Sequence, residues 1–309
     1  MRAAVVTTFG GPEAVEVVDS EMPEPGARQV RIKVAAAALN PVDAGVRAGA
    51  FGGAGKRIGL GWDVAGTVDA VGVAGGTSLL ERSRELGGAW AVGDEVVALD
   101  YGMVKPLGTH AEYVVVDTDA VAKAPATVDA VHAATLPLNA LTAARALDLL
   151  ELEPGQSLLV TGAAGAVGGF AVQLAAHRGI SVTAVAREAD EELVRSLGAD
   201  RFSSGEVAPG SVDAVLDAAL LGERALEWVR DGGVFVGVIP GAQPASVRGV
   251  RTTAVEVSPN GTHLAELARL VDEGVLTLRV AGAYALEEAA KAHARLAEGG
   301  VRGRLVLVP

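Results

Sequence analysis

The chain is 309 residues long, carries a formal net charge of −12 at pH 7 and contains no cysteine. This length suits two domains of ordinary size, and the lack of cysteine excludes disulfides and thiolate metal sites. Hydrophobic residues make up 50 % of the chain, but they are dispersed in runs too short to span a membrane. The negative charge disfavours nucleic acid and anionic lipid, so we expect a cytoplasmic protein that binds neither nucleic acid nor membrane.

The N-terminal segment, residues 1 to about 120, alternates apolar and polar residues over short stretches. The clearest examples are Val30–Val34, Gly66–Gly72 and Asp94–Leu99, which glycine, proline and asparagine separate. Such alternation predicts strands with one buried face, so this segment is expected to be rich in β-structure. Ala74–Ala91 is interpreted as a surface insertion that carries a short charged helix at Leu79–Leu86.

The middle of the chain, from about 120 to 258, alternates strand and helix patterns. Strands are predicted near residues 157–161, 181–186, 212–217 and 233–239, and helices near 166–178, 188–197 and 222–230. This alternation predicts a doubly wound parallel sheet with helices on both faces, a Rossmann arrangement.

The C-terminal segment returns to a mixed pattern. Thr262–Leu270 is predicted to form a helix, Val275–Val280 a strand, Tyr284–Ala297 a second helix and Arg304–Val308 a closing strand. In the second helix, acidic residues come early and basic residues late, a polarity that suits the helix dipole.

A glycine-rich turn follows the first predicted strand of the middle segment. Thr161 ends that strand, and Gly162-Ala-Ala-Gly165-Ala-Val-Gly168 leads into a helical pattern. Glycines let a backbone approach phosphates closely, and a helix N-terminus offers unpaired N–H groups to them. The spacing differs from the commoner G-x-G-x-x-G. We nevertheless expect a dinucleotide pyrophosphate site, with the following cofactor-binding residues: Gly162, Ala163, Gly165, Ala166 and Val167.

The end of the next strand bears on the choice of cofactor. NAD enzymes place an acidic residue there to bind the ribose 2′-hydroxyl, whereas NADP enzymes need space and positive charge for a 2′-phosphate. Here Ser181–Ala186 ends without an acid and Arg187 follows. Arg187 is therefore the candidate 2′-phosphate ligand, and the alternative is a solvated arginine at a helix start. The prediction is NADPH, with NADH possible.

Several further motifs occur in a fixed order along the chain. They are Leu39-Asn-Pro-Val-Asp43, Gly61-Trp-Asp-Val-Ala-Gly66, Val92-Gly-Asp-Glu-Val96, Gly108-Thr-His-Ala-Glu-Tyr113, Leu136-Pro-Leu-Asn-Ala-Leu-Thr142, Leu197-Gly-Ala-Asp200 and Val301-Arg-Gly-Arg304. Together with the glycine turn, they resemble the medium-chain dehydrogenase/reductase superfamily in its zinc-free quinone oxidoreductase branch. The resemblance covers essentially the whole chain.

The resemblance implies two domains. A chaperonin-10-like, β-rich catalytic domain would be built by both chain ends, residues 1–120 and 259–309. A Rossmann NADP-binding domain would comprise residues 121–258. NADPH would lie in a cleft between them.

The resemblance also implies roles for individual residues. Asn40 and Asp43 are expected as catalytic residues beside the nicotinamide. The other expected contacts are Thr142, Val238 and Ile239 for the cofactor and Phe51, Trp62 and Tyr101 for the substrate cleft. The alternatives stay open: Asn40-Pro41 is also a turn signal, Asp43 a helix cap, and Val238 and Ile239 ordinary core residues.

Some positions depart from the family pattern. Relatives often carry a lysine where this chain has Asp190 and a tyrosine where Gly205 stands, which weighs against NADPH. The tyrosines that relatives place near a quinone are replaced by Gly45 and Phe51, which leaves the usual substrate open.

Zinc is not expected. The zinc alcohol dehydrogenases of the superfamily use a cysteine and a His-Glu pair where this chain has Asn40 and Trp62-Asp63. A structural zinc lobe needs four cysteines, and the histidines of this chain are not at ligand spacing from one another.

The predicted function is therefore NADPH-dependent hydride transfer to a quinone or similar conjugated carbonyl, a small-molecule substrate. One alternative is C=C reduction of a 2-alkenal or enoyl thioester. The other is a non-catalytic nucleotide-binding protein, since a fold does not fix a function. A homodimer is expected through an edge strand near Thr252–Val257.

Overall fold

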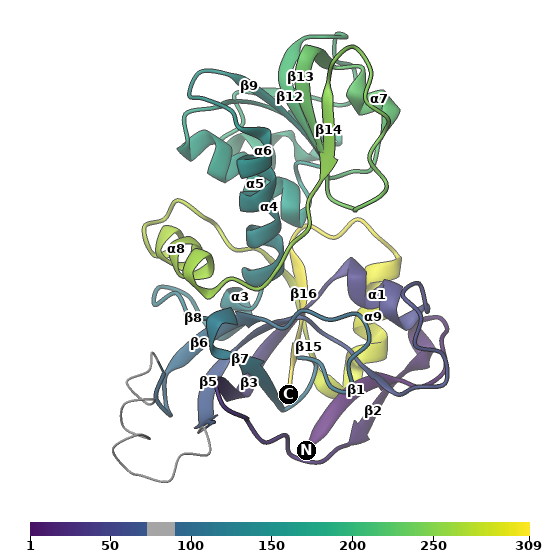
Figure 1. Ribbon diagram of the computed structural model, residues 1–309, viewed down its shortest axis with the longest axis vertical. Coiled ribbons are helices and arrows are strands. Elements are labelled where there is room, and N and C mark those ends of the chain that lie inside the picture. The colour runs from purple at the N-terminus through teal and green to yellow at the C-terminus, as the bar shows by residue number, and fades with distance from the viewer. Residues whose placement is uncertain (73–89) are drawn as a thin grey trace. The chain divides into compact units, whose positions relative to one another are not determined.

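The computed structural model describes residues 1–72 and 90–309 (Figure 1). The predicted helix Leu79–Leu86 and most of the Ala74–Ala91 insertion lie outside these residues. The described chain forms two compact units. The first comprises 1–138, 258–272 and 278–309, and the second comprises 139–257 and 273–277.

The first unit is built on a mixed sheet with the strand order β15-β16-β3-β5-β6-β8, and β7 also pairs with β3. Its strands are β3 (Gln29–Leu39), β5 (Asp63–Val71), β6 (Glu95–Leu99), β7 (Tyr113–Asp117), β8 (Val121–Lys123), β15 (Val280–Ala285) and β16 (Arg304–Val308). A smaller antiparallel sheet joins β2 (Val15–Asp19), β1 (Arg2–Val6) and β4 (Ile58–Gly59). This arrangement confirms the expected β-rich domain.

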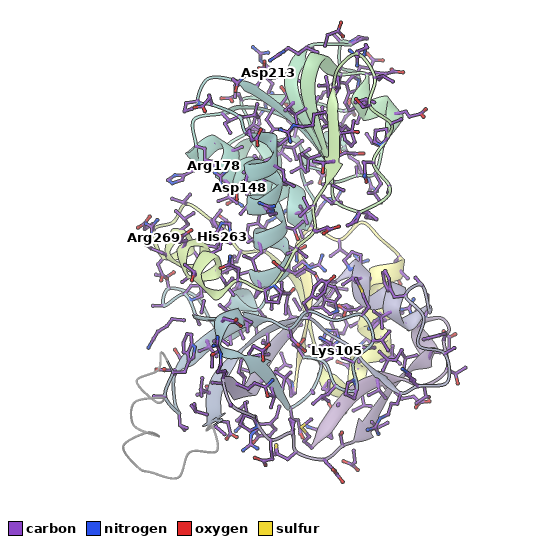
Figure 2. All side chains as sticks on the ribbon, viewed as in Figure 1. Lys105, Asp148, Arg178, Asp213, His263 and Arg269 are labelled. Carbon is purple, nitrogen blue, oxygen red and sulfur yellow. The ribbon has the colours of Figure 1, made fainter. Side chains whose placement is uncertain are left out.

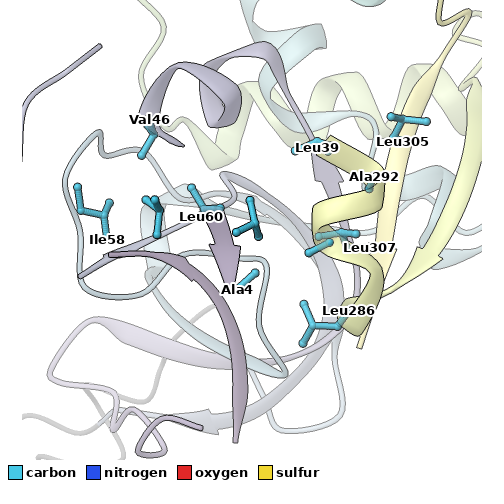
Figure 3. Close-up of a cluster of buried hydrophobic side chains, with 12 residues drawn as sticks. Ala4, Leu39, Val46, Ile58, Leu60, Leu286, Ala292, Leu305 and Leu307 are labelled. Carbon is cyan, nitrogen blue, oxygen red and sulfur yellow. The ribbon is translucent and has the colours of Figure 1, made fainter. Parts of the chain in front are cut away.

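Both chain ends contribute to the core of the first unit. The last strand, β16, runs antiparallel to β3 with Leu305 opposite Leu39, so a C-terminal strand completes an N-terminal sheet. Leu286 and Ala292 pack against the same cluster from η4 (Leu286–Glu288) and α9 (Ala289–Ala297), as Figure 3 shows. The even-numbered side chains of β3 from Val30 to Val34 face a separate buried cluster with β5, β6 and β7, as the alternating sequence pattern predicts.

The second unit is a parallel sheet with the strand order β11-β10-β9-β12-β13-β14. Its strands are β9 (Ser157–Thr161), β10 (Ser181–Val185), β11 (Arg201–Ser203), β12 (Val212–Asp217), β13 (Val229–Gly237) and β14 (Arg251–Ala254). Its helices include most of α4 (Pro137–Leu150), α5 (Ala166–His177), α6 (Glu191–Ser196) and α7 (Glu223–Leu226). The order reverses between β9 and β12, which is where such sheets bind ligands.

The structure corrects several predicted boundaries. The predicted strand Val275–Val280 lies at β15 (Val280–Ala285) instead, because those residues pair with β16. The predicted helix Tyr284–Ala297 therefore begins only at η4 and α9. The predicted helix 222–230 shortens to α7, since β13 already begins at Val229. Residues 121–138 group with the first unit because β8 pairs with β6.

The remaining predicted elements occur close to their expected places. Thr262–Leu270 lies inside α8 (Gly261–Asp272), which packs on β8. Among the described residues, no helix is long and apolar enough to cross a membrane.

Candidate active site

The glycine turn of the second unit joins β9 to α5. Gly162 has φ +59°, a left-handed conformation that glycine adopts without strain. Gly165 precedes the first turn of α5 and contributes no capping side chain. Gly165 therefore places no side chain of its own over the N–H groups that begin α5, which suits an anion-binding turn.

The turn also leaves no room for larger residues. A Cβ on Gly168 would lie 2.3 Å from the Gly162 carbonyl oxygen, and one on Gly165 would lie 3.0 Å from the same atom. These approaches explain the G-x-x-G-x-x-G spacing: one glycine makes the turn and the other two pass close to its carbonyl. The residues present fit a dinucleotide pyrophosphate at this position.

Two polar residues that the sequence analysis missed hold the neighbouring loop. Thr161 Oγ1 donates to Asp217 Oδ1 over 2.6 Å, joining the ends of β9 and β12. Asp217 also accepts from the N–H groups of Leu221 and Gly222, and Ala219 N–H donates to Thr161 Oγ1. Asp217 and Thr161 are both buried. A polar residue at the end of each of two apolar strands was the available sequence signal.

Arg187 is the second residue after β10, is exposed and forms the N-cap of the short helix η3 (Glu188–Asp190). Ala186 precedes it, so the strand ends without a carboxylate. Val238 is half-buried and Ile239 is exposed just after β13. The carboxyl ends of parallel strands meet at one sheet edge, so Arg187, Val238 and Ile239 share that edge with the glycine turn.

Thr142 lies in the second turn of α4, which begins at Pro137, and is buried. Its contact with the cofactor stays a prediction.

In the first unit, Asn40 lies between β3 and α1 (Pro41–Arg47) and is fully buried. Its Nδ2 donates to Asp63 Oδ2 over 2.7 Å, and its Oδ1 accepts from Arg304 Nη2 over 2.8 Å. Arg304 also donates to the Leu39 carbonyl oxygen. The Asn40 amide therefore connects a buried carboxylate to a buried guanidinium.

Asp43 fastens two backbone segments together. Its Oδ2 accepts from Asn40 N–H over 2.7 Å at the start of α1, and its Oδ1 accepts from Gly61 N–H over 2.9 Å. Gly61 has φ +96° and precedes Trp62. Asp43 thus makes the helix-cap contact and also positions the residues that lead into β5; its catalytic role stays a prediction.

Asp63 is fully buried and has a strongly shifted pKa. Burial raises the pKa of Asp63 to about 7, against the opposing effects of the Asn40 amide, the Leu138 N–H and the charge of Arg304. Its Oδ1 accepts from Leu138 N–H over 2.6 Å. Burial also lowers the pKa of Arg304. Arg304 was quoted in the sequence only as part of a motif, and its contact with Asn40 was missed.

The three residues predicted for the substrate cleft all lie in the first unit. Trp62 is buried, and the ring of Tyr101 meets it edge-on with centroids 4.8 Å apart. Tyr101 is 49 % exposed and Phe51 is 44 % exposed. Lys105, labelled in Figure 2, donates to the Asp100 carboxylate beside Tyr101. Their role towards a substrate stays a prediction.

A glycine turn before a helix, at the switch point of a doubly wound sheet, together with a β-rich unit built from both chain ends, defines a dinucleotide-dependent oxidoreductase. Comparison with known proteins agrees with this class. Residues 26–126 match the alcohol dehydrogenase GroES-like domain, and residues 187–307 match the zinc-binding dehydrogenase domain.

Two relatives and one solved structure are informative. The NADPH-dependent alkenal/one oxidoreductase of Arabidopsis thaliana is 34 % identical over the whole chain and 80 % of its own length. A quinone oxidoreductase of Pseudomonas aeruginosa is 29 % identical over 97 % of each chain. A mycobacterial protein solved with NADPH superposes with a TM-score of 0.83 at 27 % identity, over all of both chains. The chain belongs to the medium-chain dehydrogenase/reductase superfamily, as its motifs indicated, and it is an oxidoreductase.

Proposed function

We propose that this enzyme transfers a hydride from NADPH to a quinone or similar conjugated carbonyl compound, without zinc. The observation that carries the proposal is the sheet edge of the second unit. There the glycine turn admits a pyrophosphate, and β10 is followed by Ala186-Arg187 with no carboxylate to bind a 2′-hydroxyl. The mycobacterial structure with NADPH supports this choice of cofactor.

The residues of the second unit would hold the cofactor. The N–H groups at the start of α5, in Ala166 and Val167, face the pyrophosphate, and Ala163 and Gly165 line the turn. Arg187 places its charge on the 2′-phosphate, while Val238 and Ile239 give apolar contact at the same edge. The bound nicotinamide supplies a hydride; the protein supplies orientation and excludes water.

Asn40 and Asp43 act in this proposal as positioning residues. Neither side chain is exposed to solvent, and both are bonded to their neighbours. Asp43 fixes the backbone at Gly61 and Asn40 holds Asp63, so together they position Trp62, whose ring and that of Tyr101 would pack against a planar acceptor.

The donor set supports independence from zinc. Asn40 contributes an amide, Trp62 contributes no ligand, and the guanidinium of Arg304 lies 2.8 Å from Asn40 Oδ1. A cation at this distance opposes a second, divalent cation. Among the described residues, no group of three or more histidine, cysteine, aspartate or glutamate side chains is placed to hold a metal.

C=C reduction of a 2-alkenal or enone is the second candidate, favoured by the Arabidopsis relative. Both reactions need the same donor and similar polarisation of a carbonyl.

We also propose a homodimer through β14, which is the last strand of the parallel sheet and, among the described residues, pairs only with β13. Light scattering on the purified protein tests the dimer.

The decisive experiment follows oxidation of NADPH, and separately NADH, against benzoquinone, naphthoquinones, 2-alkenals and crotonyl thioester with a chelator present. Turnover of quinones with NADPH supports the proposal. Turnover of alkenals or the thioester alone replaces the acceptor but keeps the mechanism. Loss of all activity with chelator, restored by zinc, refutes the metal-free mechanism. NADPH binding without turnover of any acceptor leaves a nucleotide-binding protein.

A further inference from the structure

Arg224, on α7, reaches Gly205, the second residue after β11. Its Nη2 donates to the Gly205 carbonyl oxygen over 2.9 Å. A Cβ built on Gly205 would lie 3.5 Å from that same nitrogen. The guanidinium thus occupies the space into which a side chain at Gly205 would extend.

The register of the sheet brings this position next to Arg187. β10 and β11 are parallel neighbours with Val185 opposite Ser203, and Ala186 N–H donates to the Ser203 carbonyl oxygen. Arg187 and Gly205 each come two residues after that pair. Adjacent strands lie about 4.8 Å apart. Two arginines from different helical segments, Arg187 and Arg224, are therefore placed at the same end of the same strand pair.

The charge of Arg224 is not neutralised by a carboxylate in the part of the chain that the structure describes. Its guanidinium carbon lies 5.9 Å from the ring centroid of buried Trp228, a cation–π contact that supports the side chain. Exposed acids occur nearby in sequence at Glu188, Glu206 and Glu223, but none forms an ion pair with it. Arg224 therefore has donors and a positive charge available for an anion.

We propose that Arg224 is the second ligand of the cofactor 2′-phosphate and, with Arg187, determines the preference for NADPH. This inference rests on the proposed function, because it assumes that NADPH binds at this edge. A planar guanidinium suits a phosphate with two parallel hydrogen bonds. Neither Gly205 nor buried Asp190 brings a cation to this edge, so the positive charge that joins Arg187 there comes from Arg224 on α7.

The test measures binding rather than turnover. Calorimetry would compare adenosine 2′,5′-bisphosphate with AMP, which lacks the 2′-phosphate, on the full-length wild type and on Arg224→Gln and Arg187→Gln. Arg178→Gln is the matched control: Arg178 is an exposed arginine at the far end of α5, paired with Asp148 (Figure 2). Thermal melting of each variant checks that it is folded.

We expect Arg224→Gln to weaken the bisphosphate about tenfold or more, the scale of a hydrogen bond to a charged group. AMP affinity should stay within about twofold, because AMP presents no 2′-phosphate to the guanidinium. Arg178→Gln should leave both ligands unchanged. Arg224→Lys should recover part of the loss, because the charge returns without the planar fork.

Two results would overturn the proposal, and they differ in whether the proposed NADPH preference is also refuted. If Arg187→Gln weakens the bisphosphate while Arg224→Gln behaves like the control, Arg224 is not a ligand and the proposed NADPH preference survives. If the wild type binds the bisphosphate no better than AMP, which differs from it only by the 2′-phosphate, no 2′-phosphate subsite exists, and the NADPH preference fails with it.

Discussion

Arg304 and Asn40 lie 264 residues apart in the sequence and are joined by a buried hydrogen bond of 2.8 Å. On its other side the same amide donates to Asp63. A guanidinium only donates and a carboxylate only accepts, so the two neighbours fix which way the Asn40 amide points. Any replacement of Asn40 must satisfy a cation on one side and an anion on the other.

Asn40→Asp should destabilise the protein in a pH-dependent way. It places a second carboxylate against Asp63, and we expect the free energy of unfolding to fall by about 2 to 4 kcal/mol near pH 8. Part of the lost stability should be regained near pH 5, since a proton shared by the two carboxylates relieves their repulsion. Urea denaturation at both pH values measures this.

Asn260→Asp is the control for that substitution. Asn260 Oδ1 accepts a hydrogen bond from the N–H of His263 at the start of α8, and Figure 2 labels His263. A negative charge there is favourable to the helix, so the unfolding free energy should stay the same or rise. An equal loss at both pH values in Asn40→Asp would show that carboxylate repulsion is not the cause.

The buried side chain of His293 predicts a second pH dependence of stability. Its sign is opposite to that of an acid whose pKa is raised. Burial, then the charges of His110 and Arg47, lower the pKa of His293 to about 3. Arg47 Nη1 lies 3.1 Å from its Nδ1, which must accept because arginine only donates. A lowered pKa means that the unfolded chain binds the proton more readily, so stability is lost as pH falls below the ordinary value of 6.5.

Between about pH 7 and pH 5, the wild type should lose about 2 kcal/mol that His293→Gln does not lose. Glutamine keeps an acceptor for Arg47 but does not titrate. Paired urea titrations of the two proteins give the difference directly. Parallel pH curves would mean that His293 takes up its proton equally well in the folded protein.

The parts of the fold that follow from local patterns were predictable. β9, the glycine turn and α5 each show their own periodicity, so Gly162 and Gly165 could be placed before any contact was known. Contacts between distant segments were not predictable, and Arg304 with Asn40, Asp217 with Thr161 and Arg224 with Gly205 are all of that kind. The sequence marks Thr161 and Asp217 only as polar residues that end apolar strands, and it does not indicate which residue each one contacts.

The start of the C-terminal helix was predicted too early for a related reason. Ala283 and Ala285 fit a helix as well as a strand, so the sequence pattern predicts that the helix at Ala289–Ala297 extends back to Tyr284. Pairing with β16, which sets Ala285 opposite Val308, decides in favour of a strand. Tertiary pairing overrides propensity at such alanine-rich positions.

The glycine turn gives a graded prediction. Gly168→Ala puts a Cβ 2.3 Å from a carbonyl oxygen that cannot move freely, whereas Gly165→Ala puts one at 3.0 Å. We expect Gly168→Ala to lose about 1 to 3 kcal/mol of stability and most of its nucleotide affinity. Gly165→Ala should lose less of each. Calorimetry with ADP and thermal melting measure both quantities, and a larger defect in Gly165→Ala would contradict the steric argument.

Substitutions at Trp62 and Tyr101 should separate an effect on stability from an effect on substrate binding. Trp62 is 3 % exposed, so Trp62→Ala should cost about 3 to 5 kcal/mol of stability through the cavity it leaves. Tyr101 is 49 % exposed and contributes only an edge-on ring contact, so Tyr101→Ala should cost at most about 1.5 kcal/mol.

If Tyr101 lines the substrate cleft, Tyr101→Ala should also raise KM for naphthoquinone about tenfold while KM for NADPH stays unchanged, because only the acceptor loses a ring to pack against. Tyr113→Ala is the control: Tyr113 lies on β7 below the guanidinium of Arg31 and should affect neither constant. Equal KM changes for acceptor and NADPH would point to a general loosening of the first unit. Unchanged constants for both would remove Tyr101 from the cleft.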